Sequence, residues 1–373
     1  MTEVFQGVVT LVLFFLILGS LVLIHELGHF VTARLAGVRV LEFGIGFPPR
    51  AKILRSKGET LYTLNWLPIG GFVKLEGEDG EEGDDVDARS FVRARLPTRL
   101  VILVAGVAMN LFLALAIFTS IAWLATPIVG LKFPVVDPGS PADLAGLRPG
   151  DAIVTVNGKS YDYFDGDRLV TDLRGLAGQT VVIGVDRPTA PDGDVTVTLR
   201  TPADVAAGKG ALGIGTTKDQ PYFETFFTGR YTGRDLPGAV SIGVSETIRW
   251  FGLILNGLAT LVGDFVANPT AAPAVQGPVG IATQIGDVFF GVGPIMTLYV
   301  AGILSANLAL VNALPFPPLD GGRMFMILIK SIFGRRISLR AERLTYVVGF
   351  VFLFAFLIWV TGFDLVRILG GGT

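Results

Sequence analysis

Four long stretches of this 373-residue chain contain no Asp, Glu, Lys or Arg, and they constrain its fold more than any other feature of the sequence. They lie between Glu3 and Glu26, between Arg99 and Lys132, between Asp287 and Asp320, and between Arg343 and Asp364. A helix needs about 20 apolar residues to cross the hydrocarbon core of a bilayer. Each stretch is long enough, and we therefore predict four transmembrane helices.

A fifth uncharged stretch, between Arg249 and Asp264, is shorter than the others. We interpret it as an amphipathic helix that lies at the membrane interface. The composition also indicates a membrane protein, because 51% of the residues are hydrophobic and only 17% are charged, against about 25% charged in soluble proteins. The net charge of −2 predicts no nucleic-acid partner. Membrane lipid is an expected partner.

Basic residues near the predicted helix ends indicate how the chain is oriented. They are dense after the first helix and before the fourth, and sparse at both chain ends. The basic clusters comprise Arg34, Arg39, Arg50, Lys52, Arg55, Lys57, Arg89, Arg93, Arg95 and Arg99, and then Lys330, Arg335, Arg336, Arg340 and Arg343. Because such loops stay in the cytoplasm, we expect both termini and the segment between the second and third helices outside it. Without a basic n-region, the first helix is expected not to be a cleaved signal sequence.

Residues 132–216 alternate short Val- and Ile-rich stretches with turn dipeptides, a pattern that is typical of strands and turns. Within them, the stretch Val136–Gly158, which contains the turn dipeptides Pro138-Gly139, Pro149-Gly150 and Asn157-Gly158, resembles a PDZ domain. Such domains bind an extended peptide, often a C-terminus, as an added strand. We assign a PDZ domain to residues 127–218. Two roles stay open for it: a peptide C-terminus could bind in its groove, or the domain could act only as a spacer or steric plug.

Strand-like pieces occur at Val38–Ile45, Thr60–Trp66 and Phe72–Leu75, separated by glycines and prolines. Strands with unpaired edges cannot face lipid, but they can enter a membrane where protein or a water-filled cavity covers them. We predict a re-entrant hairpin in which Thr60–Trp66 is the edge strand. The alternative is a small cytoplasmic sheet without membrane contact. The acidic run at 76–87 lacks the spacing of an EF-hand and is interpreted as a solvated loop.

Both histidines of the chain occur in one pentapeptide, His25-Glu26-Leu27-Gly28-His29. On a helix, positions i and i+4 share a face, so both imidazoles can bind one cation. Zinc suits neutral imidazole, and a catalytic zinc keeps one position open for water. Zn²⁺ would lower the pKa of that water, and Glu26 would take its proton and pass it to the leaving amine. The alternative is a chance pentapeptide on a membrane-surface helix.

Two histidines and a water leave one zinc ligand to be found, and the chain has no cysteine. The candidate is Asp320, within the segment Asn312-Ala-Leu-Pro-Phe-Pro-Pro-Leu-Asp-Gly-Gly322. Its three prolines break a helix, and its glycine pair lets backbones approach closely. Broken helices at membrane depth occur where they line a cavity. The alternative is a plain Asp-Gly-Gly turn at the end of a helix.

Together, the His25-Glu-Leu-Gly-His29 motif, the segment from Asn312 through Leu319-Asp320-Gly321 and the PDZ-like domain resemble the bacterial site-2 proteases. These are zinc intramembrane metalloproteases, and the resemblance covers nearly the whole chain, here with a single PDZ domain. It implies that His25, His29 and Asp320 bind zinc and that Glu26 is the general base. It also implies that Asn312, with Asn307 one helical turn earlier, holds the substrate near the metal.

The resemblance further implies that the hairpin presents the substrate as an added strand. The candidate contacts are then Thr60, Leu61, Tyr62, Thr63 and Leu64. The expected substrates are transmembrane segments of single-pass proteins that an earlier cut has trimmed, such as anti-sigma factors or remnant signal peptides. This would be regulated intramembrane proteolysis in the bacterial inner membrane. The segment Ala105–Asn110 resembles a Gly-rich segment of the family but lacks its proline, and Asn110 is either a packing amide or an active-site residue.

The predicted fold is a polytopic α-helical membrane protein with four transmembrane helices, a membrane re-entrant β-hairpin and an inserted extracytoplasmic PDZ domain. The predicted segments are helix 1 (1–36), a cytoplasmic-side segment with the re-entrant and acidic loops (37–98), helix 2 (99–126), the PDZ domain (127–218), an interfacial linker (219–292), helix 3 (293–333), a cytoplasmic loop (334–343) and helix 4 (344–367). Two other functions stay open: a membrane-anchored PDZ scaffold without catalysis, and an ion or proton transporter.

Overall fold

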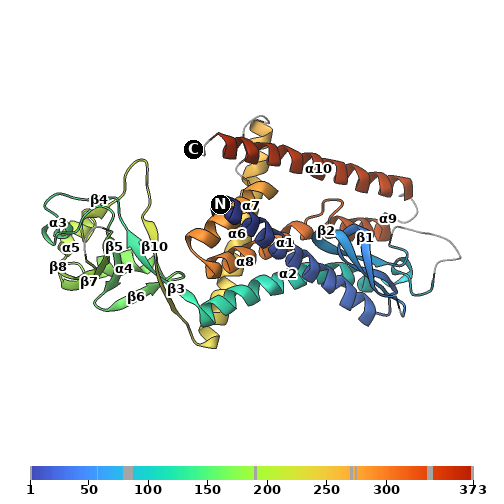
Figure 1. Cartoon of the computed structure of the whole chain (residues 1–373), viewed down its shortest axis with the longest axis horizontal. Helices are drawn as coiled ribbons and strands as arrows, with labels where there is room; N and C mark the ends of the chain where they lie inside the picture. The colour runs from blue at the N-terminus through green and yellow to red at the C-terminus, as the bar shows by residue number, and fades with distance from the viewer. Residues whose placement is uncertain are drawn as a thin grey trace. The chain divides into compact units, whose positions relative to one another are not determined.

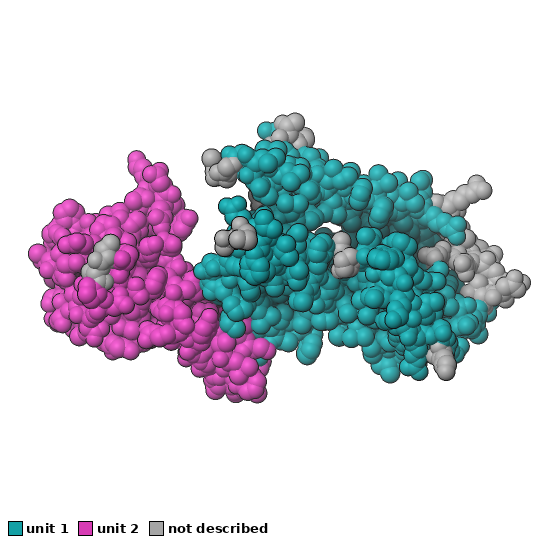
Figure 2. Space-filling model, viewed as in Figure 1, with its two compact units in different colours: residues 1–119, 243–373 teal, residues 120–242 magenta. Residues whose placement is uncertain are grey.

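A computed structural model describes residues 2–56, 58–78, 87–188, 191–268, 272–273, 275–333 and 339–370. The chain forms two compact units, which Figure 2 shows in different colours. Unit 1 comprises residues 1–119 and 243–373, and unit 2 comprises residues 120–242. Most of the predicted acidic loop, residues 79–86, lies outside the described residues.

Long helices make up most of unit 1 (Figure 1). The helices outside the β-rich region are α1 (Thr2–Leu35), α2 (Leu96–Leu124), α6 (Leu236–Ala267), α7 (Pro278–Gly291), α8 (Pro294–Ala313), α9 (Asp320–Phe333) and α10 (Leu339–Leu369), with a 3-10 turn at Phe91–Arg93. Within the described residues, five of them are long and apolar enough to cross a membrane: α1, α2, α6, α8 and α10. Four of these overlap the four uncharged stretches, and the chain is a multi-pass membrane protein.

The helix α6 differs from the short interfacial helix expected between Arg249 and Asp264. It is a single helix of 32 residues, and its length and composition would allow it to cross a membrane. Glu246, Arg249 and Asp264 interrupt this helix, so the uncharged stretches of the sequence do not reveal its length. The prediction of four transmembrane helices is therefore not confirmed by length and composition, which allow five among the described residues.

The strands β1 (Val40–Arg55) and β2 (Leu61–Leu75) form an antiparallel sheet in unit 1. Each strand turns back on itself near a glycine with positive φ, Gly46 at +81° and Gly70 at +74°. The sheet therefore has four arms, and the pairs between them give their order. From one edge to the other, the arms are residues 71–75, 40–45, 61–65 and 50–55. We call residues 71–75 the edge arm.

The prediction that Thr60–Trp66 is an edge strand is wrong, because the arm at 61–65 is paired on both sides. Tyr62 pairs with Phe43 on one side and with Arg55 on the other, and Thr63 and Leu64 are also paired twice. The cause is the arm at 50–55, which the sequence analysis did not recognise as a strand. Because that arm covers one side of residues 61–65, the free edge of the sheet nearer α1 is the edge arm, residues 71–75.

A buried carboxylate holds the unrecognised arm in the sheet. Arg50 Nε donates to Glu42 Oε1 at 2.9 Å, and Thr63 Oγ1 donates to the same oxygen at 2.8 Å. Burial acts to raise the pKa of Glu42, but the hydrogen bonds from Arg50 and Thr63 outweigh it and hold the pKa below its ordinary value. Arg50 is one of the basic residues that make this segment unlike a strand in the sequence. In the fold, its contact with Glu42 holds the segment in the sheet.

The helix α1 lies at the centre of unit 1, with a buried cluster at each half. Near its N-terminal half, Phe14 and Ile17 pack against Ile285 of α7 and Val300 of α8. Near its C-terminal half, the cluster joins α1 to the sheet and to α2 and α9 through Ala33, Val38, Val40, Leu75, Phe91, Ile102, Leu103 and Ile327. A Cβ on Gly28 would lie 2.5 Å from the Ala105 carbonyl oxygen, so small residues let α1 and α2 approach closely.

Unit 2 is β-rich and has its own core. Its six-stranded sheet has the order β10-β3-β6-β5-β7-β8, and β4 pairs separately with β9. The strands are β3 (Thr126–Lys132), β4 (Val135–Val136), β5 (Ala152–Val156), β6 (Lys159–Asp162), β7 (Thr180–Asp186), β8 (Gly193–Thr198), β9 (Ile214–Gly215) and β10 (Glu224–Thr232), with helices α3 (Pro141–Leu144), α4 (Arg168–Gly175) and α5 (Pro202–Ala206). The β-rich region is as predicted. However, its sheet also includes β10, which pairs with β3 and lies within the predicted linker at 219–292.

Candidate metal centre

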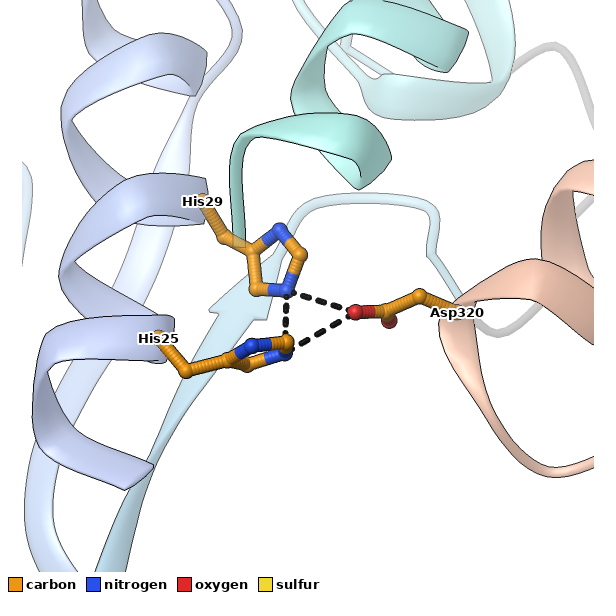
Figure 3. A group of neighbouring side chains, drawn as sticks. All are labelled: His25, His29 and Asp320. Atoms are coloured by element: carbon orange, nitrogen blue, oxygen red, sulfur yellow. Dashed lines mark hydrogen bonds and ion pairs between the residues drawn. The ribbon is translucent and has the colours of Figure 1, made fainter. Parts of the chain in front are cut away.

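The two histidines of α1 face the same side of the helix, one turn apart. Their Nε2 atoms are 3.1 Å apart, and the two residues are only 6% and 8% exposed. Figure 3 shows both imidazoles pointing toward the carboxylate of Asp320. The spacing of four residues on a continuous helix is sufficient to bring the two nitrogens together.

Asp320 reaches the histidines from the start of α9, 291 residues beyond His29. Its Oδ2 lies 2.9 Å from His25 Nε2 and 3.1 Å from His29 Nε2. The turn between α8 and α9 brings it there, and Gly322 permits this turn. A Cβ on Gly322 would lie 2.6 Å from the backbone of Phe316 and Pro317, closer than real side chains come. The glycine pair after Asp320 is therefore part of what positions its carboxylate.

The three side chains fit a zinc ion. One ligand atom from each lies within 4.8 Å of the others. A tetrahedral zinc with bonds of about 2.0–2.1 Å holds its ligand atoms about 3.4 Å apart. The observed separations of 2.9–3.1 Å are close to that value, so small side-chain rotations would admit the ion. Two imidazoles and one carboxylate also form a ligand set of catalytic zinc sites.

The helix α2 forms the wall behind the two imidazoles. His29 Nδ1 donates to the carbonyl oxygen of Ile102 at 2.8 Å, which leaves Nε2 free to bind a metal. His25 Nδ1 lies 3.3 Å from Nδ2 of Asn110. A Cβ on Gly106 would lie 2.5 Å from His29 Nε2 and 2.8 Å from His25 Cε1. Only a glycine leaves room for both rings.

A cavity of about 330 Å³ contains this cluster together with Glu26 and Asn312. One carboxylate oxygen of Glu26 accepts a hydrogen bond from the Val73 N–H of the edge arm at 3.1 Å. The cavity is lined by Val22, His25, Glu26, His29, Phe47, Gly71, Phe72, Val73, Leu75, Glu78, Ile102, Leu103, Leu308, Asn312, Pro318, Leu319, Asp320 and Arg323. Asn307 and the predicted substrate contacts Thr60, Leu61, Tyr62, Thr63 and Leu64 are not among them.

Two charged residues that the sequence analysis did not single out also line the cavity. Glu78 accepts a hydrogen bond from the Leu75 N–H at 3.1 Å, and its other oxygen forms an ion pair with Arg323. Arg323 lies one turn after Asp320 on α9. Glu78 therefore joins the end of the edge arm to the helix that carries Asp320. Its place in the acidic run suggested only a solvated loop, and no local pattern reveals a partner 245 residues away.

The model of peptidase family M50 matches residues 13–356. The chain belongs to peptidase family M50. This confirms the resemblance to the site-2 proteases that the two motifs indicated, and it makes the chain a metallopeptidase by family.

Relatives of this M50 chain are similar over nearly its whole length. Zinc metalloprotease RasP of Geobacillus kaustophilus is 26% identical, and the alignment covers 98% of this chain and 99% of the relative. A Clostridium perfringens protein whose name describes a zinc metalloprotease is 32% identical, with 93% and 96% covered. A chloroplast protein of Arabidopsis thaliana named as a membrane metalloprotease, ARASP2, is 30% identical, with 88% and 73% covered.

Proposed function

We propose that this M50 chain is a zinc-dependent endopeptidase that cleaves transmembrane segments of single-pass membrane proteins. The observation that carries the proposal is the convergence of His25, His29 and Asp320 beside Glu26, in a cavity among apolar helices. Ionisable groups in such helices are costly and usually functional. Cleavage of a membrane-embedded reporter, with and without a zinc chelator, tests the proposal.

Each polar residue of the cavity has a role in this reaction. His25, His29 and Asp320 would hold Zn²⁺, which when bound makes a water molecule acidic enough to act as a nucleophile near neutral pH. Glu26 accepts the proton of that water as its oxygen attacks the peptide carbonyl carbon. When the C–N bond breaks, Glu26 delivers the proton to the leaving amine. Asn312, which also lines the cavity, would donate an amide N–H to the substrate backbone.

The substrate must unwind before it is cut, because a transmembrane helix satisfies all its backbone hydrogen bonds internally. An unwound segment can be held as an added strand on a free sheet edge. The edge arm meets this requirement, since Gly71, Phe72, Val73 and Leu75 line the cavity and the Val73 N–H points to Glu26. We propose that a substrate carbonyl replaces Glu26 at the Val73 N–H.

Replacing Val73 with Pro should raise KM while changing kcat little. Proline removes the outward N–H, and it is tolerated at a sheet edge whose N–H is not part of the ladder. Loss of one hydrogen bond is worth about 0.5–1.5 kcal/mol, which corresponds to a KM about 2- to 10-fold higher. The control is Val73→Ala, which keeps the N–H. Equal KM values for the two variants would show that the substrate does not use this donor.

We propose four membrane crossings, with α6 lying along the extracytoplasmic interface. Along its length α6 contacts the end of α2, the start of α8 and the later part of α10. Trp250 Nε1 donates to the Tyr299 hydroxyl of α8 at 2.9 Å, and the rings of Phe265 and Trp359 of α10 are 5.8 Å apart. With the orientation predicted from basic residues, all these contacts lie on the extracytoplasmic side. In Figure 1, α6 also runs across α1 and α10 and not alongside them.

The absence of cysteine from the chain makes this topology directly testable by single-cysteine labelling. In spheroplasts, a membrane-impermeant maleimide should label Ala267→Cys at the end of α6, and Thr217→Cys in unit 2. Arg55→Cys, in the cytoplasmic-side sheet, should react only after the membrane is permeabilised. If α6 crosses the membrane instead, Ala267→Cys will behave like Arg55→Cys.

We further propose that unit 2 is a PDZ domain that faces the periplasm or cell exterior and screens substrates. The support is the PDZ-like stretch at 136–158, which lies within a compact β-rich unit with a core of its own. A domain of this size would exclude proteins whose outer domain is still intact, and a groove on it could bind a newly exposed C-terminus. Trimmed anti-sigma factors and remnant signal peptides in a bacterial inner membrane meet this requirement, because each has a transmembrane segment without an intact outer domain.

A further inference from the structure

The side chain of Asn110 is buried in the wall behind His25 with only part of its hydrogen-bonding capacity used. Asn110 is fully buried, and its Nδ2 lies 3.3 Å from His25 Nδ1. Its Oδ1 has no hydrogen-bond partner among the described residues. The backbone is fixed from the other side, because Ser305 of α8 donates to the Asn110 carbonyl oxygen at 2.8 Å. A buried polar atom without a partner is costly and calls for an explanation.

Binding of a metal through Nε2 determines where the proton of each imidazole must lie. A neutral imidazole carries one N–H, so Nε2 can bind a metal only if Nδ1 is protonated. His29 meets this condition, because its Nδ1 donates to the Ile102 carbonyl oxygen. The Nδ1–H of His25 needs an acceptor too, but the Asn110 Nδ2 beside it is itself a donor.

Rotation of the Asn110 amide by 180° resolves this conflict. Asn side chains present a donor and an acceptor at nearly equivalent positions, and the network decides which way they point. After rotation, Oδ1 lies next to His25 Nδ1 and accepts a hydrogen bond from its N–H. One movement thus pairs the lone oxygen of Asn110 with the otherwise unpaired N–H of His25, and Nδ2 moves to the former position of Oδ1.

We propose that Asn110 is a positioning residue that accepts the Nδ1–H of His25 through its amide oxygen and so directs Nε2 to the zinc ion. This proposal rests on the zinc site of the proposed function. It adds Asn110 to Ile102 as a residue of α2 that orients a histidine of that site. It also explains why an amide is found at this point of an apolar helix. A packing amide would need only its volume, whereas this role needs an acceptor.

Two substitutions separate the acceptor role from packing. Asn110→Leu keeps the approximate volume but has no acceptor, and Asn110→Asp keeps the acceptor. In the detergent-solubilised full chain, the zinc dissociation constant is measured by competition with a chelating dye. Leu is expected to weaken zinc binding about 10- to 100-fold, as loss of such outer contacts generally does, and Asp is expected to stay near wild type. Thr297→Val, another buried polar position in unit 1, should leave the constant unchanged.

The proposal is overturned if Leu binds zinc as tightly as wild type, or if Asp weakens binding as much as Leu. Nitrogen NMR of the zinc-loaded wild-type chain gives a second test that needs no variant, because His25 should carry its proton on Nδ1 in a hydrogen bond. A proton on Nε2 would also overturn it. Failure of the proposed function would look different, since the wild-type chain itself would then bind no zinc and cleave no reporter.

Discussion

The Glu26→Gln variant is expected to retain its zinc and to lose cleavage of a membrane-embedded reporter by about 10²–10⁴-fold, the usual contribution of a general base. Glu26 lines the cavity, but its carboxylate bonds to the Val73 N–H and does not belong to the His25, His29 and Asp320 cluster. Its amide replacement can still accept that hydrogen bond but cannot take a proton. His25→Ala and Asp320→Ala should instead lose both zinc and activity, because each removes a proposed ligand.

The measurement combines zinc content per chain with reporter cleavage, in the presence and absence of a zinc chelator. Wild type without chelator should be the active sample, and chelator should remove its activity. A scaffold or a transporter predicts no cleavage in any sample. Equal zinc content in Glu26→Gln, His25→Ala and Asp320→Ala would contradict the roles proposed for these residues.

Replacing Gly106 with Ala should be almost as damaging as removing a ligand, although Gly106 has no side chain to contribute. The added methyl group would overlap the rings of His25 and His29, which lie 2.5–2.8 Å from its position. Overpacking of this kind costs about 1–3 kcal/mol, and each 1.4 kcal/mol is tenfold in affinity. If the imidazoles move to relieve the overlap, zinc binding should weaken by about 10- to 100-fold and cleavage should fall with it.

The matched control is Gly7→Ala in α1, where no heavy atom other than the adjoining backbone of its own helix lies within 4 Å of the added methyl group. Both changes introduce the same group into a membrane helix, so any general effect on insertion or helix stability should be similar. Zinc affinity and cleavage are measured for both variants in the same detergent. Wild-type zinc affinity in Gly106→Ala would mean that the rings can shift without loss of the metal.

The sequence predicted the local part of the candidate site and missed the part that depends on tertiary packing. His25 and His29 could be paired from their spacing alone, because helical geometry relates residues four apart. Asp320 could be proposed from an interrupted apolar stretch and a family resemblance. In contrast, Glu78 meets Arg323 only because β2 and α9 pack together, and nothing in the acidic run indicates that contact.

The same distinction explains the errors in the fold. The edge strand was misplaced because arm 50–55 is rich in basic residues and does not resemble a strand, whereas Glu42 in a neighbouring arm holds it in place. The length of α6 was underestimated because charged residues interrupt its apolar sequence. One of these, Glu246, is buried and accepts a hydrogen bond from the Tyr299 hydroxyl at 2.5 Å. In both cases, a charged residue that has a partner in the fold lies in the part of the strand or helix that was not recognised from the sequence.

The wide separation of His29 and Asp320 along the chain has a consequence for biosynthesis. A ribosome makes the histidine pair almost at once, but it must translate 291 more residues before the carboxylate exists. Until then the nascent chain has an incomplete set of the proposed ligands, so we expect that it cannot cleave the proteins with which it shares the insertion machinery. Any product truncated before residue 320 should likewise be harmless to the membrane that receives it.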